Sequence, residues 1–589
     1  MLGADADRAS GVQADRLAAK FFRGPDDFLM SRDASRILLL IASIYLLVGT
    51  VGHDPWRGDD ARHFGLVFEM IDTGSLLLPA FGGDTSLGYG PLFYWLASGL
   101  ATLLQGLLPL HDSARLTTAL LAAAALWALW RASSLMHGDQ ARAAVVLLTI
   151  GSLGLVVHVH ETQPAVGLMA AQAWVLWMLV SPHRLAMPAA GVAAGIAFLF
   201  AGIAGALVTW PLLLFQLLPS DRSHRTSPIA VLVALAIAIG IALAWIVPAS
   251  ASAGWQPWLD AEIDGLRPGT PAADKAVDWL KLFGWFLWPL WPLALWSLWR
   301  AWHGAQISHV PLLLSALVLA LVAVALAGSL RPVNMLPLIV PVGLLAAPAV
   351  ERLRRGAAAA FDWFAVMTFT TFGLMLWLAW SALVNAWPPG LARHFKKLAP
   401  GFDMTLGVLA LAVAAGAVVA WIVYLASRRP AGRDAAWTWA LGMTLLWCLA
   451  TAMGQPWFDH SRSYRPAAQQ LAEVLRKHPG QCVDGIGLGL SQRSAMHYFA
   501  GVRIDGDPER RGCPLILVFQ DRRSATTDLA TLGHELWRFE RGGGRQHERF
   551  TLLAARPGPL SRASGSCPDN APVRQSTHRC RPAPHGAPS

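Results

Sequence analysis

Long runs of apolar residues, broken by short polar connections, fill the chain from about residue 36 to residue 453. Their lengths approach the roughly 20 residues that a helix needs to cross about 30 Å of hydrocarbon. After residue 453 the pattern turns polar, and a helical stretch (RPAAQQLAEVLRK) alternates with short apolar stretches that indicate strands (CVDGIGL, PLILVFQ and RFTLLAA). The pattern predicts a polytopic α-helical membrane protein with a small C-terminal α/β domain.

The apolar runs give about thirteen candidate transmembrane helices. Six arginine-rich connections fall on the same side of these spans as the N-terminus, which the positive-inside rule assigns to the cytoplasm. An odd number of spans then puts the C-terminal domain on the outer side. We expect the spans near residues 36–53, 113–130, 142–160, 163–181, 187–203, 205–218, 228–250, 281–300, 309–328, 332–350, 361–385, 404–427 and 435–453.

One further apolar segment, residues 91–109, would break this parity if it crossed the membrane. We therefore expect it to lie re-entrant or flat along the outer face, with Tyr94 and Trp95 at the interface. If it crosses instead, the boundary that must change is the hairpin drawn between residues 187 and 218.

These patterns divide the chain into four parts. Residues 1–35 form a cytoplasmic segment, and residues 36–453 form the transmembrane domain with a long outer loop at 54–112. Residues 454–557 form the α/β domain on the periplasmic side. The tail, residues 558–589, is rich in Pro, Ser, Arg and Gly, which predicts disorder.

The composition agrees with a membrane protein and argues against nucleic-acid binding. Of 589 residues, 54% are hydrophobic and only 14% are charged. The net charge of +10 comes mostly from short loops between spans, where the positive-inside bias explains it. In an oxidising periplasm Cys482 and Cys513 are expected to form a disulfide, and Cys567 and Cys580 a second one in the tail. Cys448 lies in a span and is expected to be inert.

Two adjacent carboxylates, Asp59 and Asp60 in the stretch GDDARH, follow directly on the first span. Carboxylates at a membrane boundary are costly to desolvate, so they are either solvated or act on a cation, a proton or a hydroxyl. A solvated acidic loop is the plain interpretation of such a pair. The residues around the pair favour a functional site over a solvated loop.

The loop reads W-x-x-D-D-A-R-H, then E-M-I-D-T-G-S-L-L-L-P, then G-P-L-F-Y-W-L. This order resembles the first outer loop of polyprenol-phosphate-dependent glycosyltransferases of the GT-C class, in particular the lipid A aminoarabinose transferases and the bacterial protein O-mannosyltransferases. Residues 195–214 and 331–341 and the stretch SYRPAAQQLAEVL resemble later parts of the same family. The resemblance covers nearly the whole chain.

This resemblance implies a GT-C fold in a bacterial inner membrane. It implies a sugar donor carried on a polyprenyl phosphate and an acceptor that enters from the outer face, such as lipid A, another envelope glycan or a protein. The reaction would be a single inverting displacement. Membrane lipids would be further partners.

The same resemblance assigns roles to residues. Asp59 takes the place of the essential aspartate as base, Asp60 that of the following glutamate, and Glu161 the second acidic position. A leaving phosphate needs cations at the outer interface, for which Arg331 is the first candidate and Arg62 the second. The full set of substrate-binding candidates is Arg62, His63, Tyr89, Arg267 and Arg331.

The chain departs from the family at two places. Gly88-Tyr89-Gly90-Pro91 stands where the family has Glu-Lys-Pro-Pro, and Ala201-Gly202-Ile203 stands where it has Lys-Gly-Pro. A metal site that uses the missing glutamate cannot be carried over, so no metal ligand and no cofactor are assigned, and the need for a divalent metal stays open. Either the donor or acceptor differs, or catalysis has been lost.

Two other classes of function are therefore kept. A transporter or flippase is disfavoured because most acids lie in outer loops or terminal domains and not in mid-span. A non-catalytic envelope scaffold built on an enzyme fold is compatible with the missing glutamate and lysine.

Overall fold

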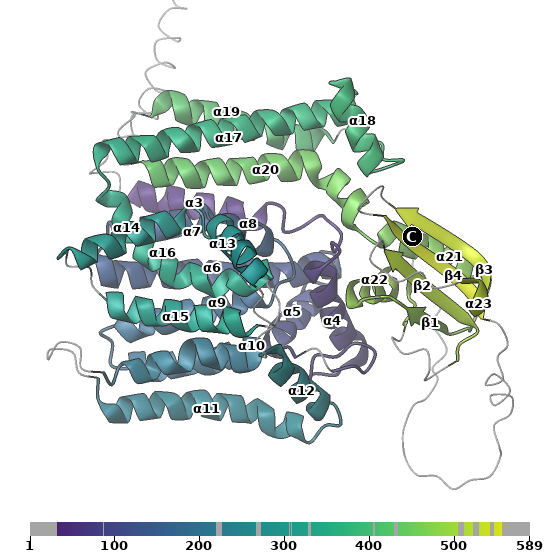
Figure 1. Ribbon diagram of the computed structural model, residues 1–589, viewed down its shortest axis with the longest axis horizontal. Helices are drawn as coiled ribbons and strands as arrows, with labels where there is room; N and C mark the ends of the chain where they lie inside the picture. Colours follow the sequence, from purple (N-terminus) through teal and green to yellow (C-terminus); the bar gives the residue numbers. More distant parts are fainter. Residues whose placement is uncertain are drawn as a thin grey trace, which may run out of the picture.

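The computed structural model places a set of long helices side by side and a small α/β unit at one end of them (Figure 1). It describes residues 32–555 except 86–87, 219–225, 267–272, 306, 308, 328–330, 405–406, 429–433, 505–511, 522–528 and 542–546. The predicted N-terminal segment, the candidate Arg267, the tail and its Cys567–Cys580 pair lie outside the described residues.

Seven helical segments in the described part of the chain are long and apolar enough to cross a membrane. The most apolar is α11, with a mean hydropathy of 2.9. Several other apolar helices are shorter, so the count of thirteen spans stays a prediction. The seven are α6 (Leu110–His137), α10 (Ala186–Phe215), α11 (Pro228–Ser250), η1 with α16 (Pro332–Met335 and Leu336–Glu351), α17 (Arg355–Val384), α19 (Val408–Ser427) and α20 (Ala435–Arg462).

The remaining helices are shorter than these segments or less apolar. Many of their small residues are fully buried, which lets neighbouring helices approach closely. They are α3 (Arg32–Leu47), α4 (Asp59–Thr73), α5 (Leu92–Leu103), α7 (Ala141–Ile150), α8 (Leu153–His158), α9 (Ala165–Val180), α12 (Trp255–Gly265), α13 (Ala273–Phe286), α14 (Leu290–Trp302), α15 (Val310–Leu326) and α18 (Pro389–Leu398).

Helix α10 is a hairpin of two arms and not one straight rod. The indole N–H of Trp210 donates to the carbonyl oxygen of Ala194 at 3.1 Å, although sixteen residues of straight helix would separate them by about 24 Å. The chain reverses at Ala201 and Gly202, where Gly202 has a φ of 53°. The predicted hairpin at residues 187–218 is therefore confirmed.

Helix α5 occupies most of the segment whose crossing was in question. Its 12 residues span about 18 Å, which is too short to cross the hydrocarbon core. The expected interfacial position of Tyr94 is wrong, because Tyr94 is fully buried and its hydroxyl lies 2.9 Å from Nδ1 of His63. Trp95 is partly buried, and its indole N–H donates to Leu76.

The C-terminal unit begins after α20, which continues past the predicted end at residue 453 to Arg462. Its four strands lie in the order β1-β2-β4-β3, with β1 parallel to β2 and the other pairs antiparallel. The elements are α21 (Arg465–Leu475), β1 (Val483–Ile486), α22 (Leu490–Ala500), β2 (Leu515–Asp521), α23 (Leu529–Leu532), β3 (Gly533–Arg541) and β4 (Glu548–Ala555). The expected disulfide between Cys482 and Cys513 is present, with the two Cα atoms 5.3 Å apart.

Candidate functional site

Asp59 and Arg331 form an ion pair, although 272 residues separate them in the sequence. Asp59 is the first residue of α4, and Arg331 directly precedes η1 and α16. Both side chains line a cavity of about 420 Å³. Other polar residues that line this cavity are His63, Tyr89, Gln163, Glu262 and Asn334.

The surroundings of Asp59 keep its carboxyl group ionised. Burial acts to raise its pKa, but the neighbouring His63, Arg331 and Arg62 outweigh burial and hold the pKa below the ordinary value. His63 itself is fully buried, and burial lowers its pKa to about 3. Since burial keeps His63 neutral near neutral pH, the guanidinium groups of Arg331 and Arg62 are the charges that keep the Asp59 carboxylate ionised there.

The substrate-binding candidates Arg62, His63 and Tyr89 lie together beside Asp59. A guanidinium N–H of Arg62 donates to the Tyr89 hydroxyl at 3.3 Å, and the rings of His63 and Tyr89 are 4.9 Å apart. Gly90 packs so closely that a Cβ there would overlap the carbonyl oxygen of Leu199. The turn that carries Tyr89 therefore packs tightly on α10 just before α10 reverses.

Asp60 is placed differently from Asp59. Its side chain is fully buried, does not line the cavity, and accepts backbone N–H bonds from Trp56 at 3.0 Å and Thr162 at 2.8 Å. Burial acts to raise its pKa, but Arg115 and other partners lower it below the ordinary value. With its carboxylate bound by these groups and outside the cavity lining, Asp60 is placed to support the loop before α4, and the catalytic role expected for it stays a prediction.

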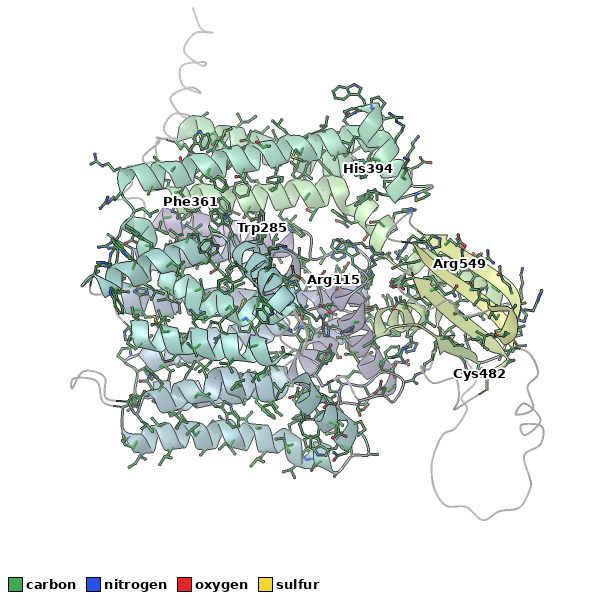
Figure 2. All side chains as sticks on the ribbon, viewed as in Figure 1. Arg115, Trp285, Phe361, His394, Cys482 and Arg549 are labelled. Carbon is green, nitrogen blue, oxygen red and sulfur yellow. A yellow bond between two sulfur atoms is a disulfide. The ribbon has the colours of Figure 1, made fainter. Side chains whose placement is uncertain are left out.

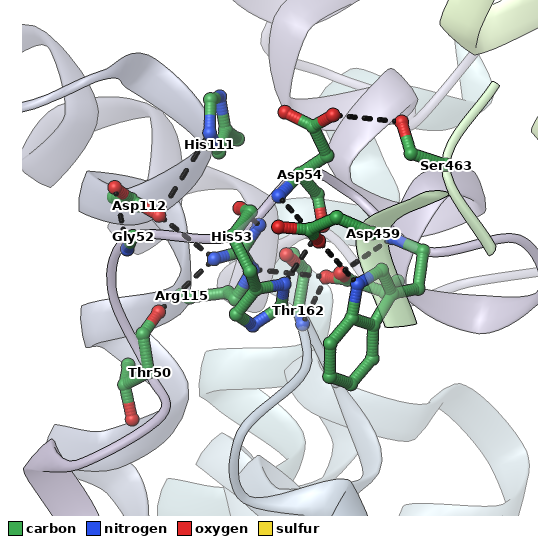
Figure 3. A network of polar contacts seen from close by, with 12 residues as sticks. Thr50, Gly52, His53, Asp54, His111, Asp112, Arg115, Thr162, Asp459 and Ser463 are labelled. Atoms are coloured by element: carbon green, nitrogen blue, oxygen red, sulfur yellow. Dashed lines mark hydrogen bonds and ion pairs between the residues drawn. The ribbon is translucent and has the colours of Figure 1, made fainter. Parts of the chain in front are cut away.

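Arg115 holds the loop that precedes α4, and it was not singled out from the sequence. It lies on α6, toward the end of the helices where the C-terminal unit packs (Figure 2), and its side chain has no exposed surface. Its guanidinium donates to Asp112 at 2.8 Å, to the carbonyls of Thr50 at 3.0 Å and His53 at 2.7 Å, and to Asp60 at 3.4 Å (Figure 3). An arginine near the end of an apolar run was the available signal.

Glu161 lies next to this network but does not line the cavity. Its neighbour Thr162 binds Asp60, and its own carboxylate lies 3.7 Å from Nδ1 of His158. Burial raises the pKa of Glu161. The nearby charges of Asp60 and Asp59 also act to raise this pKa, so Glu161 lies within electrostatic reach of Asp59 although it does not line the cavity, and its catalytic role stays a prediction.

Glu262 lines the cavity and was also missed. It lies on α12, in a segment that the sequence marks only as an outer loop, and it is about nine-tenths buried. Its Oε2 accepts the backbone N–H of Ile203 at 2.8 Å, and burial raises its pKa to about 7.

Among the described residues, no group of three or more His, Cys, Asp or Glu side chains is arranged to hold a metal ion.

The C-terminal unit packs directly on the helix that carries Asp59. The Ser491 hydroxyl donates to the carbonyl oxygen of Gly58 at 2.7 Å, one residue before Asp59. Gly65 of α4 faces Ser494 of α22 so closely that a Cβ on Gly65 would overlap the serine Oγ. Arg503 forms an ion pair with the buried Glu69.

Replacing Gly65 by Ala should destabilise this interface. Because overpacking a tight contact costs about 1–3 kcal/mol, we expect a lower thermal unfolding midpoint for the purified protein. The Gly65→Ala/Ser494→Gly double variant removes the overlapping side chain and should recover most of the loss. A matched control is Gly99→Ala on α5, where nothing lies within 4 Å of the added Cβ. Equal midpoints for Gly65→Ala and wild type would contradict the close packing.

No protein-family model matches the chain, and no curated protein matches its sequence. Among solved structures, ArnT from Cupriavidus metallidurans bound to undecaprenyl phosphate aligns with a TM-score of 0.64 and 16% identity over 88% of this chain and 97% of that one. The same protein in the apo state gives a TM-score of 0.63 over the same shares. The oligosaccharyltransferase AglB from Archaeoglobus fulgidus aligns at 0.42 with 12% identity over 83% of this chain and 70% of that one.

The chain thus has the fold of ArnT, which is the GT-C fold that the motif resemblance predicts. The alignment extends over nearly all of ArnT, so it covers the helical part and reaches beyond it.

Proposed function

We propose that this protein is a membrane glycosyltransferase that moves a sugar from a polyprenyl-phosphate carrier to an acceptor at the outer face of a bacterial inner membrane. The observation that carries the proposal is the Asp59–Arg331 pair on the wall of a 420 Å³ cavity, within the fold of a protein solved with undecaprenyl phosphate bound. The Asp59 carboxylate can act as a base, Arg331 can bind a phosphate, and the cavity can hold a substrate. These are the features that transfer of a sugar from a phosphate requires.

In the proposed reaction, Asp59 takes the proton of the acceptor hydroxyl as the acceptor oxygen attacks the anomeric carbon. The new bond joins that carbon to the acceptor oxygen, and the bond to the phosphate oxygen breaks with its electron pair. The products are the glycosylated acceptor, with inverted configuration, and free polyprenyl phosphate. Arg331 and Arg62 stabilise the negative charge that develops on the phosphate.

The pairing of Arg331 with Asp59 couples donor binding to activation of the base. In the ligand-free pair, the arginine lowers the pKa of Asp59 and makes it a weak proton acceptor. A donor phosphate competes with the carboxylate for the same guanidinium, because both are oxyanions of suitable geometry. Once Arg331 turns to the phosphate, Asp59 becomes more basic when the acceptor arrives.

The apolar wall of the cavity supports a lipid-linked donor. Leu168 of α9, Val208 of α10 and Ala323 of α15 line it together with the polar residues. A polyprenyl chain can pack against such side chains while its phosphate stays at Arg331.

The topology belongs to the same proposal. We infer an N-terminus in the cytoplasm, about thirteen spans and a periplasmic C-terminal unit. The outer loop and the C-terminal unit lie at the same end of the helices, as Arg465 binds Asp54 at 2.9 Å and Arg57 binds Glu548 at 3.0 Å. Contacts of this kind support a common side for both segments.

The proposed acceptor is an envelope lipid such as lipid A, another glycan or a protein. The second candidate function is a non-catalytic envelope scaffold. The specific observation in favour of the scaffold is Gly88-Tyr89-Gly90-Pro91, which supplies neither the acid nor the lysine of the resembling family. Here Arg62, bonded to Tyr89, provides a cation near that turn.

Mass spectrometry of lipid-linked sugars and envelope glycans, with and without the gene, tests the proposal. Without the gene, one sugar should disappear from an envelope acceptor, and its polyprenyl-phosphate donor should accumulate. Unchanged profiles of both pools would reject the transferase and leave the scaffold.

A further inference from the structure

Helix α12 is held by contacts at its N-cap and in its first turns, before Glu262. The indole N–H of Trp258 donates to the carbonyl oxygen of Tyr89 at 3.0 Å, and the Thr85 hydroxyl donates to that of Gly254 at 2.7 Å. Trp258 is nearly fully buried, and its ring packs edge-on against Trp245 of α11, 5.0 Å away. The position of Glu262 is therefore set by the same turn that carries Tyr89.

The carboxyl group of Glu262 fills the space left by the reversal of α10. A Cβ on Gly202 would overlap its oxygens, so only glycine leaves room for it. Oε2 accepts the N–H of Ile203 at the start of the second arm. No partner within the described part of the chain is recorded for Oε1, and the residue lines the cavity.

Capping the second arm of α10 does not by itself require a glutamate at position 262. One acceptor oxygen is enough for a helix start, and an amide or hydroxyl supplies it without burying an ionisable group. Burial brings the pKa of Glu262 to about 7, so near neutral pH the group can both accept and donate a hydrogen bond. Oε1 and the carboxyl proton of Glu262 are therefore available to form hydrogen bonds with a group that enters the cavity.

The charged groups of the cavity come from different elements. Glu262 lies on α12, whereas Asp59 begins α4 and Arg331 directly precedes η1. A phosphate is drawn to Arg331 and repelled by an ionised Glu262. The group that reaches Glu262 must instead carry hydrogen-bond donors.

We propose that Glu262 binds a hydroxyl or amino group of the saccharide-bearing substrate and so helps to select it. This inference rests on the proposed function and adds to it a residue that contacts the polar part of the substrate away from the phosphate. The group can belong to the donor sugar or to the acceptor, because both present the same chemistry.

The test measures dissociation constants of the full-length protein in nanodiscs by native mass spectrometry. The probes are undecaprenyl phosphate, the same lipid bearing mannose or aminoarabinose, and lipid A as acceptor. The variants are Glu262→Gln, which keeps an acceptor for the Ile203 N–H, and the matched control Asp260→Asn, an exposed carboxylate on the same helix.

We expect Glu262→Gln to bind undecaprenyl phosphate as wild type does, but to bind one sugar-bearing lipid at least tenfold more weakly. If only lipid A binds tenfold more weakly, the acceptor is the source of the group. Asp260→Asn should leave every constant unchanged, and an unchanged thermal unfolding midpoint for Glu262→Gln shows that the fold is kept.

Two results would overturn the inference while wild type still binds undecaprenyl phosphate. One is equal binding of all four probes by Glu262→Gln and wild type. The other is a loss that includes the bare carrier lipid, which would make Glu262 a support for the cavity wall only. If wild type binds none of the lipids, the proposed function itself fails.

Discussion

Asp59→Asn should abolish the sugar transfer that wild type restores to cells lacking the gene. General-base catalysis contributes about 10²–10⁴-fold to a rate, so a loss of this size is expected from removing the base alone. Asparagine has nearly the same shape as aspartate and can still accept a hydrogen bond from Arg331. The fold and the protein level should therefore stay close to those of wild type.

The measurement compares the envelope glycan that disappears without the gene in cells complemented with wild type or Asp59→Asn at equal protein level. Asp403→Asn serves as the control, because Asp403 is an exposed carboxylate in the connection between α18 and α19. Full glycan restoration by Asp59→Asn would mean that this carboxylate is not the base, even if the transferase itself is real.

The Asp59–Arg331 pair could be anticipated because charged residues at membrane boundaries are few. Each charged residue is easily recognised in an apolar sequence, and the order of the motifs indicated that Asp59 and Arg331 belong to one site. The hairpin at residues 187–218 was predicted from two successive apolar runs, whereas its turn at Ala201 and Gly202 is known only from the structure. Patterns of this kind depend on local sequence.

Glu262 and Glu161 show why other parts of the site could not be predicted. Glu262 lies in WLDAEIDG, where three acids in five residues read as a solvated face, and only the packing of α12 on Gly202 buries one of them. Glu161 matched a motif position, but its carboxylate lies 3.7 Å from Nδ1 of His158 and is not part of the cavity lining. Side-chain direction and long-range burial decide both cases.

The missed strand β3 has a similar cause in the C-terminal unit. Its sequence GHELWRFER alternates polar and aromatic residues, and as the edge of the sheet it needs no continuous apolar run. The predicted strands at β1, β2 and β4 lie in the interior or contribute more buried residues, so their apolar pattern was readable.

Arg115→Met should cause the largest loss of stability among the substitutions considered. Arg115 is fully buried and neutralises Asp60 and Asp112, while its N–H groups satisfy the carbonyls of Thr50 and His53. Removing one partner of a buried ion pair costs about 3–5 kcal/mol, because the other charge is left uncompensated. The loop before α4 should open, and Asp59 should lose its position.

The purified variant should unfold at a clearly lower temperature than wild type, and limited proteolysis should cut within residues 48–58. Arg131→Met on the same helix is the matched control, since Arg131 is exposed and packs over the ring of Trp177 at 5.6 Å. Adding Asp60→Asn to Arg115→Met removes one uncompensated charge and should restore part of the stability. A single variant as stable as wild type would show that the network does not hold the loop, and the positioning of Asp59 would need another cause.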